Sequence, residues 1–424
     1  MFGNLPFSEL GFSAFFNRGF KGMTHKKSSA CEAVVPEAAS LEGDRERTRL
    51  SAGPALPTQT VGPKLFRPAA SPGAAPAVLS EHSTKAPIAE PRSKGKTLST
   101  TLPKAEVLFH RHPKNPILTA ADWPYAINCV FNAAATLLKD GTTLLLCRVE
   151  DRRGHSHLCA ARSKNGVDGW EIDREPTLMP DPKNHPEELW GIEDPRITYV
   201  PELGKYVVVY TSFSSSGPGV SLALTEDFKT FERYGDIMPP EDKDAALLPR
   251  RIGNYWALIH RPVSGTLGAN IWLSYSPDLR HWGSHRVILE ARRGAWWDAN
   301  KIGLSPPPIE TPEGWLFLYH GVRRTAAGCI YRLGLALFDL NSPERCIRRG
   351  DSWIFSPEEP YERYGDVDNV VFPCGYTIGA DGDTINMYYG GADSCIALAT
   401  GSIRGLLTWL EKDGKPDDPL HEHV

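Results

Sequence analysis

One acidic residue stands in an apolar stretch of the sequence that could serve acid catalysis. Asp194 lies in the segment WGIEDPRIT, close to Trp190 and directly before Pro195. Such neighbours are expected to shield its carboxyl group from water, and burial raises a carboxyl pKa toward the range that a general acid needs. The structural alternative is an ion pair between Asp194 and Arg196, or a simple strand entry at the turn 193–195. Taken alone, the motif fits this alternative better than catalysis.

A second group consists of basic residues near the ends of apolar runs: Lys243, Arg261, Lys301 and His320. Long cations are rarely placed beside apolar runs without a partner. If strand ends bring them together, they would bind a small oxyanion. Phosphate is the natural candidate, because arginine matches its geometry with paired hydrogen bonds. The alternative is a set of unrelated salt bridges, for which Asp244 or Asp298 could serve. Each cation alone fits the alternative better, whereas the whole set favours an anion site.

A third group carries the side chains that suit a sugar. Asparagine, aspartate and arginine bind hydroxyl groups, and tyrosine faces stack on pyranose rings. The members are Asn132, Arg148, Asp366, Asp368, Asn369, Tyr389 and Asp393. The alternative is turn chemistry, since aspartate and asparagine favour turns in any protein. For Asp366 and Asp368 the two interpretations are about equally supported.

The elements that would position these residues are β-strands. From about residue 104, short runs rich in Val, Ile, Leu, Tyr and Thr alternate with turn residues. Examples are TTLLLCRVE, KYVVVYTSF, YWALIHRP, NIWLSYS, WLFLYHGV, RLGLALFDL, INMYYGGAD and SCIALATGS. The segments Lys139-Asp140-Gly141 and Ala380-Asp381-Gly382 predict hairpin turns. Such a sequence, with few long amphipathic helices, is typical of a sandwich, a barrel or a propeller.

An internal repeat favours the propeller among these folds. The segments SKNGVDGWEIDREPTLM, LTEDFKTFERYGDIM and YSPDLRHWGSHRVIL each follow a strand. Their aromatic residues Trp170, Phe231 and Trp282 are 61 and 51 residues apart. Recurrence at this spacing suggests blades of four antiparallel strands. Residues 104–424 divide into five blades of about 64 residues, so an all-β, five-bladed β-propeller with an axial funnel is predicted, although the arithmetic alone would allow six.

Composition excludes several classes of function. The chain has 424 residues and a formal net charge of −4, whereas a general nucleic-acid binder would carry a strong basic excess. It contains no apolar run of 18 or more residues, so no transmembrane helix is expected. Eight cysteines without a C-x-x-C pair predict neither a disulfide scaffold nor a zinc site. We therefore expect free thiols, a cytoplasmic protein, and no metal or cofactor.

The first quarter of the chain differs in composition from the rest. All 11 tryptophans and all 14 tyrosines follow residue 100. Residues 1–103, rich in Ala, Pro, Ser and Thr, are expected to form a disordered tail, because they cannot bury enough apolar surface to offset chain entropy. The phenylalanine-rich first 20 residues leave open a contact segment, or a true start at Met23. A secretory signal fits less well, since polar residues interrupt the apolar core. Residues 104–424 are expected to form the propeller.

Eight motifs in a fixed order carry a resemblance to a known family. They are NPIL (115–118), FNAAAT…LLCRVED (131–151), GIEDPR (191–196), KDAALLP…HRP (243–262), WWDANKIGLSPPPI (296–309), YHG (319–321), DNVVFP (368–373) and YYGGAD (388–393). This order resembles glycoside hydrolase family 130, and more narrowly its β-1,4-mannooligosaccharide phosphorylases, over roughly residues 105 to 415. Two departures, at 132–134 and 249–251, put fine specificity in doubt rather than the reaction.

The resemblance implies a five-bladed propeller with its active site in the axial funnel. It implies that Asp194 is the single catalytic proton donor. The phosphate-binding positions that it implies are Lys243, Arg261, Lys301 and His320. The positions that it implies around the mannosyl ring are Asn132, Arg148, Asp244 and Asp393.

The implied reaction is inverting phosphorolysis, in which inorganic phosphate attacks the anomeric carbon of a non-reducing-end β-1,4-mannosyl unit. The products are α-D-mannose 1-phosphate and a shortened acceptor, with phosphate as co-substrate and no cofactor. An inverting hydrolase needs a second carboxylate as base, whereas a phosphorylase needs a cationic cradle for its anionic nucleophile. In related enzymes the acid is thought to act through the sugar's 3-hydroxyl group.

Two rival functions remain at this point. One is an inverting β-mannoside hydrolase on the same fold, with Asp366, Asp368 or Glu150 as base. The other is a non-catalytic propeller that binds glycans. The acceptor and the oligomeric state stay open, a homo-oligomer included.

Overall fold

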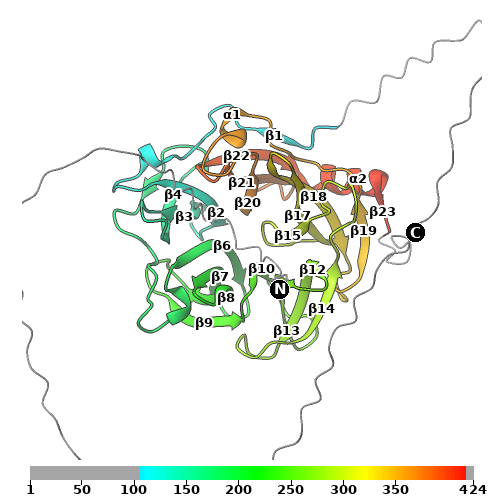
Figure 1. Cartoon of the computed structure of the whole chain (residues 1–424), viewed down its shortest axis with the longest axis horizontal. Coiled ribbons are helices and arrows are strands. Elements are labelled where there is room, and N and C mark those ends of the chain that lie inside the picture. Colours follow the sequence, from blue (N-terminus) through cyan, green and yellow to red (C-terminus); the bar gives the residue numbers. More distant parts are fainter. Residues whose placement is uncertain (1–105, 417–424) are drawn as a thin grey trace, which may run out of the picture. The chain divides into compact units, whose positions relative to one another are not determined.

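The computed structural model describes residues 106–416, which fold almost entirely into β-strands (Figure 1). The strands predicted from the sequence are confirmed, and both predicted hairpin turns contain a glycine with positive φ, Gly141 at 80° and Gly382 at 68°. The predicted tail, 1–103, lies outside the described residues, so the division of the chain at residue 104 stays a prediction. None of the helices in the described part is long and apolar enough to cross a membrane.

The strands form four hydrogen-bonded sheets. The largest has eight strands: β2 (Cys129–Leu137), β3 (Thr143–Glu150), β4 (Ser156–Ser163), β5 (Glu171–Ile172), β6 (Gly191–Val200), β7 (Lys205–Ser214), β8 (Gly217–Thr225) and β9 (Glu232–Met238). A single parallel residue pair, Ser156 with Gly191, joins β4 to β6, whereas all other pairings in this sheet are antiparallel. The sheet is therefore two antiparallel groups, β2–β5 and β6–β9.

Three further antiparallel groups complete the fold. One contains β10 (Asp242–Leu247), β11 (Trp256–Ser264), β12 (Gly268–Ala269), β13 (Ile271–Ser276) and β14 (Gly283–Leu289). The next contains β15 (Lys301–Leu304), β16 (Ile309–Thr311), β17 (Gly314–Thr325), β18 (Gly328–Phe338), β19 (Cys346–Gly350) and β23 (Gly414–Lys415). The last contains β1 (Phe109–Arg111), β20 (Val371–Ile378), β21 (Thr384–Gly391) and β22 (Cys395–Ser402).

Helical segments are few and short in the described part of the chain. They are η1 (Ala120–Asp122), η2 (Pro186–Glu188), α1 (Pro360–Arg363) and α2 (Ile403–Asp413). Only α2 is longer than one turn. The Ser402 hydroxyl accepts a hydrogen bond from the Gly405 backbone N–H at 3.0 Å and so caps its first turn.

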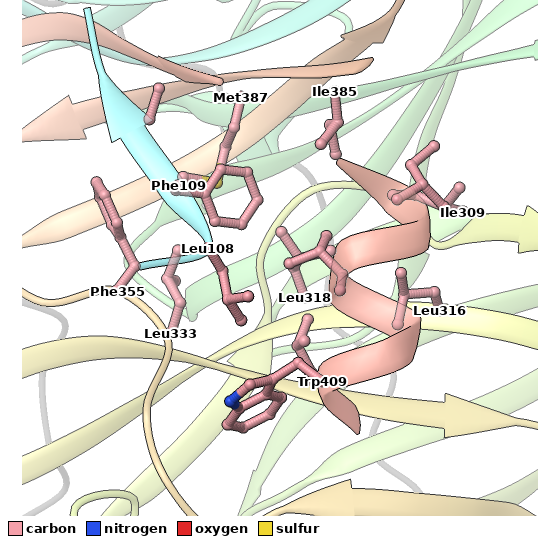
Figure 2. Packing of buried hydrophobic residues seen from close by; sticks show 14 of the residues in the cluster. Leu108, Phe109, Ile309, Leu316, Leu318, Leu333, Phe355, Ile385, Met387 and Trp409 are labelled. Atoms are coloured by element: carbon pink, nitrogen blue, oxygen red, sulfur yellow. The ribbon is translucent and has the colours of Figure 1, made fainter. Parts of the chain in front are cut away.

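Apolar clusters lie between consecutive groups of strands. Four clusters join β2–β5 to β6–β9, β6–β9 to β10–β14, β10–β14 to β15–β19, and β20–β22 to β2–β4. A fifth joins β15–β18 to the sheet of β20–β22, and Trp409 of α2 and Phe109 of β1 both enter it (Figure 2). Each group thus packs against two others, and the groups follow one another around a common centre (Figure 1).

The internal repeat marks equivalent places in three of these groups. Trp170, Phe231 and Trp282 each directly precede the last strand of their group, β5, β9 and β14. The indole N–H groups of Trp170 and Trp282 each donate to a backbone carbonyl three residues earlier, both at 3.1 Å. The predicted recurrence of one supersecondary unit is therefore confirmed at these three places.

Candidate active site

Three strands near the common centre share one backbone irregularity. The ladders of β2, β6 and β10 each contain a bulge, and one residue within it has a left-handed backbone. These residues are Asn132 (φ 48°), Asp194 (φ 46°) and Asp244 (φ 55°). Asparagine and aspartate tolerate this conformation better than other residues with a Cβ atom, and a bulge redirects a side chain out of the strand's alternation. A bulge of the same kind thus redirects a polar side chain in each of three successive groups of strands.

Asp194 lies in a buried network with residues of β2 and β3. Its Oδ1 atom accepts hydrogen bonds from the amide of Asn132 at 2.9 Å and from the guanidinium of Arg148 at 3.1 Å. Arg148 also donates to Glu193 at 3.1 Å and contacts Glu150 at 3.5 Å. The predicted residues Asn132, Arg148 and Asp194 therefore contact one another.

Asp244 is the centre of a second buried network. Its Oδ2 atom accepts a hydrogen bond from Arg261 Nε at 2.8 Å and lies 3.4 Å from His320 Nε2. The His320 Nδ1 atom is 3.2 Å from the hydroxyl of Ser305. Asp244, Arg261 and His320 thus meet although they come from β10, β11 and β17.

Arg196 connects the two networks. Its guanidinium donates to the backbone carbonyls of Asp194, Leu304 and Ser305 at 3.0, 3.0 and 2.9 Å, and it lies 3.7 Å from Asp244 Oδ1. The structural alternative considered from the sequence was an ion pair between Asp194 and Arg196. In the structure Arg196 binds the backbone carbonyl of Asp194, and Arg148 binds its carboxylate.

Two glycines make room for the bulged side chains. A Cβ atom on Gly303 would lie 2.5 Å from Asp244 Oδ2 and 2.6 Å from His320 Cε1. A Cβ atom on Gly390 would collide with the Asn132 amide oxygen. Close packing of this kind holds the networks in one arrangement.

A hydrogen-bonded chain supports Arg261 from the side of β11. The backbone N–H of Arg261 donates to Asp242 at 3.1 Å, and the other carboxylate oxygen of Asp242 lies 2.5 Å from His260 Nδ1. His260 Nε2 lies 2.7 Å from the Ser274 hydroxyl. This resembles the order of groups in a nucleophilic triad, but Ser274 and His260 are buried at 0% and 3% exposure, so the chain positions Arg261 rather than attacking a substrate.

The positive charges lower the pKa of Asp194. Burial alone would raise it, as expected from the sequence, but Arg148, Lys243 and Arg196, with the hydrogen bond from Asn132, outweigh burial. The expectation of a raised pKa is therefore wrong. Its error has a physical cause: Arg148 and Lys243 lie 46 and 49 residues away in sequence and only the fold brings them near.

Other groups in the site are also shifted. The pKa of Asp244 lies well below its ordinary value, because Arg261, His320 and Arg196 outweigh its burial. Burial lowers the pKa of His320 to about 4 despite the charge of Asp244. The imidazole is therefore neutral at pH 7 and acts as a hydrogen-bonding group rather than as a cation. Burial, with the charges of Asp194 and Glu150, raises the pKa of Asp393 to about 7.

The remaining predicted residues lie around these networks. Lys243 is the residue before Asp244, and its Nζ atom is 3.9 Å from Glu193 Oε2. Lys301 begins β15, with its Nζ atom 5.3 Å from the centre of the Tyr331 ring. Asp393 interacts with Arg148, Asp194 and Lys243 through their charges.

Several weighed residues do not join the site. Tyr389 lies in the apolar core and donates to Glu362 at 2.8 Å, so it does not stack on a ligand. Asp366 is exposed and accepts a hydrogen bond from Asn128 at 2.8 Å. Asp298, considered as a partner for the predicted cations, accepts instead from Arg292 and Arg349 at 3.3 and 2.8 Å.

Sequence reasoning missed the roles of four residues. Glu193, Arg196, Ser305 and Tyr331 all contact the predicted set. The motif GIEDPR contained the first two, and a charged residue on either side of Asp194 was the available signal. Ser305 and Tyr331 carry no local signal, because their importance depends on the pairing of β15, β17 and β18.

Comparison with known proteins identifies the family. The family model for glycoside hydrolase family 130, described as β-1,4-mannooligosaccharide phosphorylase, matches residues 110–412. The chain belongs to glycoside hydrolase family 130. It is an enzyme of the type that its curated relatives represent, the mannoside phosphorylases.

Three relatives illustrate the range of this family. A β-1,4-mannooligosaccharide phosphorylase from Ruminococcus albus is 32% identical over 308 residues, which cover 71% of this chain and 90% of the relative. A β-1,2-mannobiose phosphorylase from Listeria innocua is 38% identical over 262 residues, 61% of this chain and 70% of the relative. A structure of the latter enzyme type from Listeria innocua, in complex with β-1,2-mannobiose, has a TM-score of 0.65 at 30% identity and covers 72% of this chain and 99% of its own.

A further solved structure comes from work on hydrolases of the same family. It is described as part of a family of mannoside phosphorylases that contains glycoside hydrolases targeting β-1,2 mannosidic linkages in Candida mannan. Its TM-score is 0.62 at 27% identity, and the match covers 76% of this chain and 99% of that chain. Family membership therefore leaves the nucleophile and the linkage to be argued from the site.

Proposed function

We propose that this enzyme catalyses inverting phosphorolysis of non-reducing-end β-1,4-mannosides, giving α-D-mannose 1-phosphate and a shortened acceptor. Its substrates are then a β-mannosyl oligosaccharide and inorganic phosphate, with no further cofactor. The observation that carries the proposal is the convergence of Arg261, His320 and Lys243 beside Asp244, next to the network of Asp194.

The basic side of the site suits an anionic nucleophile. The Nε atom of Arg261 donates a hydrogen bond to Asp244. The two terminal nitrogens of the guanidinium group therefore remain to bind an oxyanion. His320 Nε2 faces Asp244 and its Nδ1 faces the Ser305 hydroxyl, so the neutral imidazole, with a single N–H, helps to hold Asp244 and Arg261 in place beside the anion. Phosphate brings its own negative charge and needs no base, whereas water would need an unpaired carboxylate. Two of the carboxylates near Asp194, Glu193 and Glu150, are both engaged with Arg148.

The acid role of Asp194 follows once phosphate enters. A bound anion offsets the positive charges of Lys243 and its neighbours, which now hold the pKa of Asp194 down. The pKa of Asp194 then rises, and the carboxyl group can carry the proton that the leaving oxygen needs. The proposed route for this proton passes through the 3-hydroxyl group of the bound mannosyl unit. Asn132, Arg148, Asp244 and Asp393 are the proposed contacts of that unit.

The proposed architecture is a five-bladed propeller, supported by the five antiparallel groups and by the five apolar clusters between them. The site then lies in the axial funnel.

The type of glycosidic linkage that is cleaved is the most specific part of the proposal. The family model and the Ruminococcus relative favour β-1,4, whereas the 38% identity with the Listeria relative favours β-1,2 as the second candidate.

One experiment tests both the nucleophile and the linkage. The protein is incubated with β-1,4-mannobiose or β-1,2-mannobiose, each with and without inorganic phosphate, and mannose 1-phosphate is measured. We expect product from the β-1,4 substrate only when phosphate is present. Release of free mannose at the same rate without phosphate would replace the proposal by the hydrolase alternative, and product from β-1,2-mannobiose alone would replace the linkage.

Variants of the basic set test its role. Removing a charge-assisted hydrogen bond weakens binding by roughly 10- to 150-fold, so Arg261→Ala and Lys301→Ala should weaken the apparent affinity for phosphate by that much. The apparent affinity for the mannoside should change much less. A purely structural salt bridge predicts equal changes for both substrates together with a lower melting temperature.

A further inference from the structure

A cavity of about 410 Å³ lies outside the active site, between the segment before β15 and the ends of β17 and β19. Its wall includes Arg293, Trp296, Trp297, Arg323, Asp351 and Trp353, here called the tryptophan–arginine pocket. The volume falls within the range of small-molecule sites.

The pocket is separate from the active site because the two lie on opposite faces of one sheet. His320 and Arg323 are three residues apart on β17, whose pairing with β18 is regular throughout. Successive side chains of a strand point to opposite faces, so Arg323 points away from the face that carries His320. Lys301 pairs with Val322 and so shares the face of His320.

Two tryptophan rings present surface to the pocket. Trp296 and Trp353 are 40% and 47% exposed, which is unusual for such large apolar side chains. An arginine supports each ring: Arg292 lies 4.3 Å from the centre of Trp296 and Arg332 lies 4.4 Å from the centre of Trp353. Rigid aromatic faces of this kind stack on the apolar face of a pyranose ring.

The pocket also carries positive charge that its neighbours do not neutralise. Arg293, Arg323 and Arg332 make no side-chain hydrogen bond or ion pair with any of residues 106–416. The wall carboxylate, Asp351, is already held by Arg292 at 3.1 Å and Lys415 at 2.5 Å. The Nε atom of Arg332 is buried without a partner, and burial together with the charge of Arg323 lowers the pKa of that guanidinium.

We propose that the tryptophan–arginine pocket binds a phosphorylated pyranose, with the ring stacked on Trp353 or Trp296 and the phosphate held by Arg323 and Arg293. Guanidinium groups match the geometry of phosphate. Two arginines and two tryptophans in one wall could therefore bind both the phosphate and the sugar ring of such a ligand. The natural ligand is then α-D-mannose 1-phosphate, an identity that rests on the proposed function. The inference that the pocket binds a phosphorylated pyranose does not depend on the proposed function. The enzyme would thus hold its product at a second place, apart from the site that forms it.

Binding stoichiometry of mannose 1-phosphate, measured by calorimetry without acceptor so that no reaction occurs, tests the proposal. We expect two ligands per wild-type chain. Arg323→Ala and Trp353→Ala should each weaken one of the two binding events by roughly 10- to 150-fold, in line with the loss of a charge-assisted contact. Trp353→Phe, which keeps an aromatic face, should retain it. Arg280→Ala is the matched control, because Arg280 also lies over an aromatic ring, that of the half-buried Tyr234 at 3.9 Å, and neither residue lines the pocket.

The outcomes separate this proposal from the proposed function. If the wild type binds one ligand and Arg261→Ala abolishes it while Arg323→Ala does not, the pocket proposal is overturned and the active site stands. If one ligand is bound and Arg323→Ala abolishes it, the pocket stands and the active-site assignment falls. If neutral β-1,4-mannobiose occupies the site that is lost in Arg323→Ala as tightly as mannose 1-phosphate does, the phosphate part of the proposal is overturned.

Discussion

At the scale of single residues, the site depends on carboxylates whose charges are set by partners distant in sequence. Asp194 is buried at 3% exposure, yet its pKa lies below the ordinary value because Arg148, Lys243 and Arg196 surround it. A buried acid with a low pKa is a poor proton donor until an anion arrives. In the proposed reaction, the acid therefore gains its proton when phosphate binds beside Lys243.

Asp194→Asn tests the acid directly. The substitution keeps the shape of the side chain but removes the proton, so turnover on mannobiose should fall by about 10²–10⁴-fold. An aryl β-mannoside with a good leaving group needs less acid assistance and should lose much less activity. Steady-state rates on both substrates give the comparison, and a variant within a few-fold of wild type on mannobiose would remove Asp194 from the role.

Asp393 makes stability depend on pH in a defined direction. Its pKa of about 7 in the folded chain exceeds the ordinary value, so between about pH 4 and pH 7 the folded state holds a proton that the unfolded state releases. The contribution of Asp393 is full below pH 4 and is lost as the pH rises through 7. Chemical denaturation of wild type and Asp393→Asn across this window should show the variant gaining relative stability with pH.

A control separates this effect from the loss of any negative charge. Asp366→Asn removes one negative charge at an exposed position, so its stability relative to Asp393→Asn shows how much of the change comes from net charge alone. A stability difference between wild type and Asp393→Asn that does not vary with pH would contradict the assignment.

At the scale of elements, a repeated bulge explains how strands deliver chemistry to one place. The alternation of β2, β6 and β10 would send every second side chain into the apolar clusters between groups. A bulge in each strand breaks this alternation at Asn132, Asp194 and Asp244. The periodicity of the sequence predicts the strands well, because burial on both faces leaves long apolar runs. The bulges could not be predicted, because they depend on φ values and ladder shifts that no residue pattern here specifies.

Gly303→Ala tests the tight fit around Asp244. The backbone of Gly303 does not need positive φ, so the substitution acts only through its methyl group, which would lie 2.5 Å from Asp244 Oδ2. Overpacking of this kind costs about 1–3 kcal/mol, and we expect lower stability together with weaker phosphate binding. Gly283→Ala is the control, since a Cβ atom there meets nothing within 4 Å. Equal melting temperatures and phosphate affinities for the two variants would show that the site relaxes freely.

At the scale of the whole molecule, the all-β class and the repeat could be predicted from the sequence, and the meeting of the networks could not. The types of Lys243, Arg261 and His320 suggested an anion site, and Asp244 was expected either as a salt-bridge partner or, from the resemblance, near the mannosyl ring. In the structure Asp244 pairs with Arg261 and His320 and thereby orients them, which is compatible with the proposed anion site as well as with a salt bridge. A local pattern cannot separate a structural ion pair from a positioned ligand group when one contact does both.

The first strand of the described residues pairs with one of the last. Strand β1, from the beginning of the described chain, pairs with β22 near its end, with Phe109 opposite Gly401 (Figure 1). Phe109 is 2% exposed within the cluster that also contains Met387 and Trp409 (Figure 2). Arg111 adds a hydrogen bond to Glu362 at 2.8 Å. The fold therefore depends on the segment just after the predicted tail.

Two truncations should consequently behave very differently. Removal of residues 1–103 leaves β1 in place, so the melting temperature and the rate of phosphorolysis should stay close to those of the full chain. Removal of residues 1–112 deletes β1, and since truncation of one buried phenylalanine costs about 3–5 kcal/mol, we expect a loss at least that large. Phe109→Ala in the full chain should account for much of it. If the shorter deletion lowered stability as much as the longer one, the phenylalanine-rich start would belong to the folded unit, and the boundary at residue 104 would be wrong.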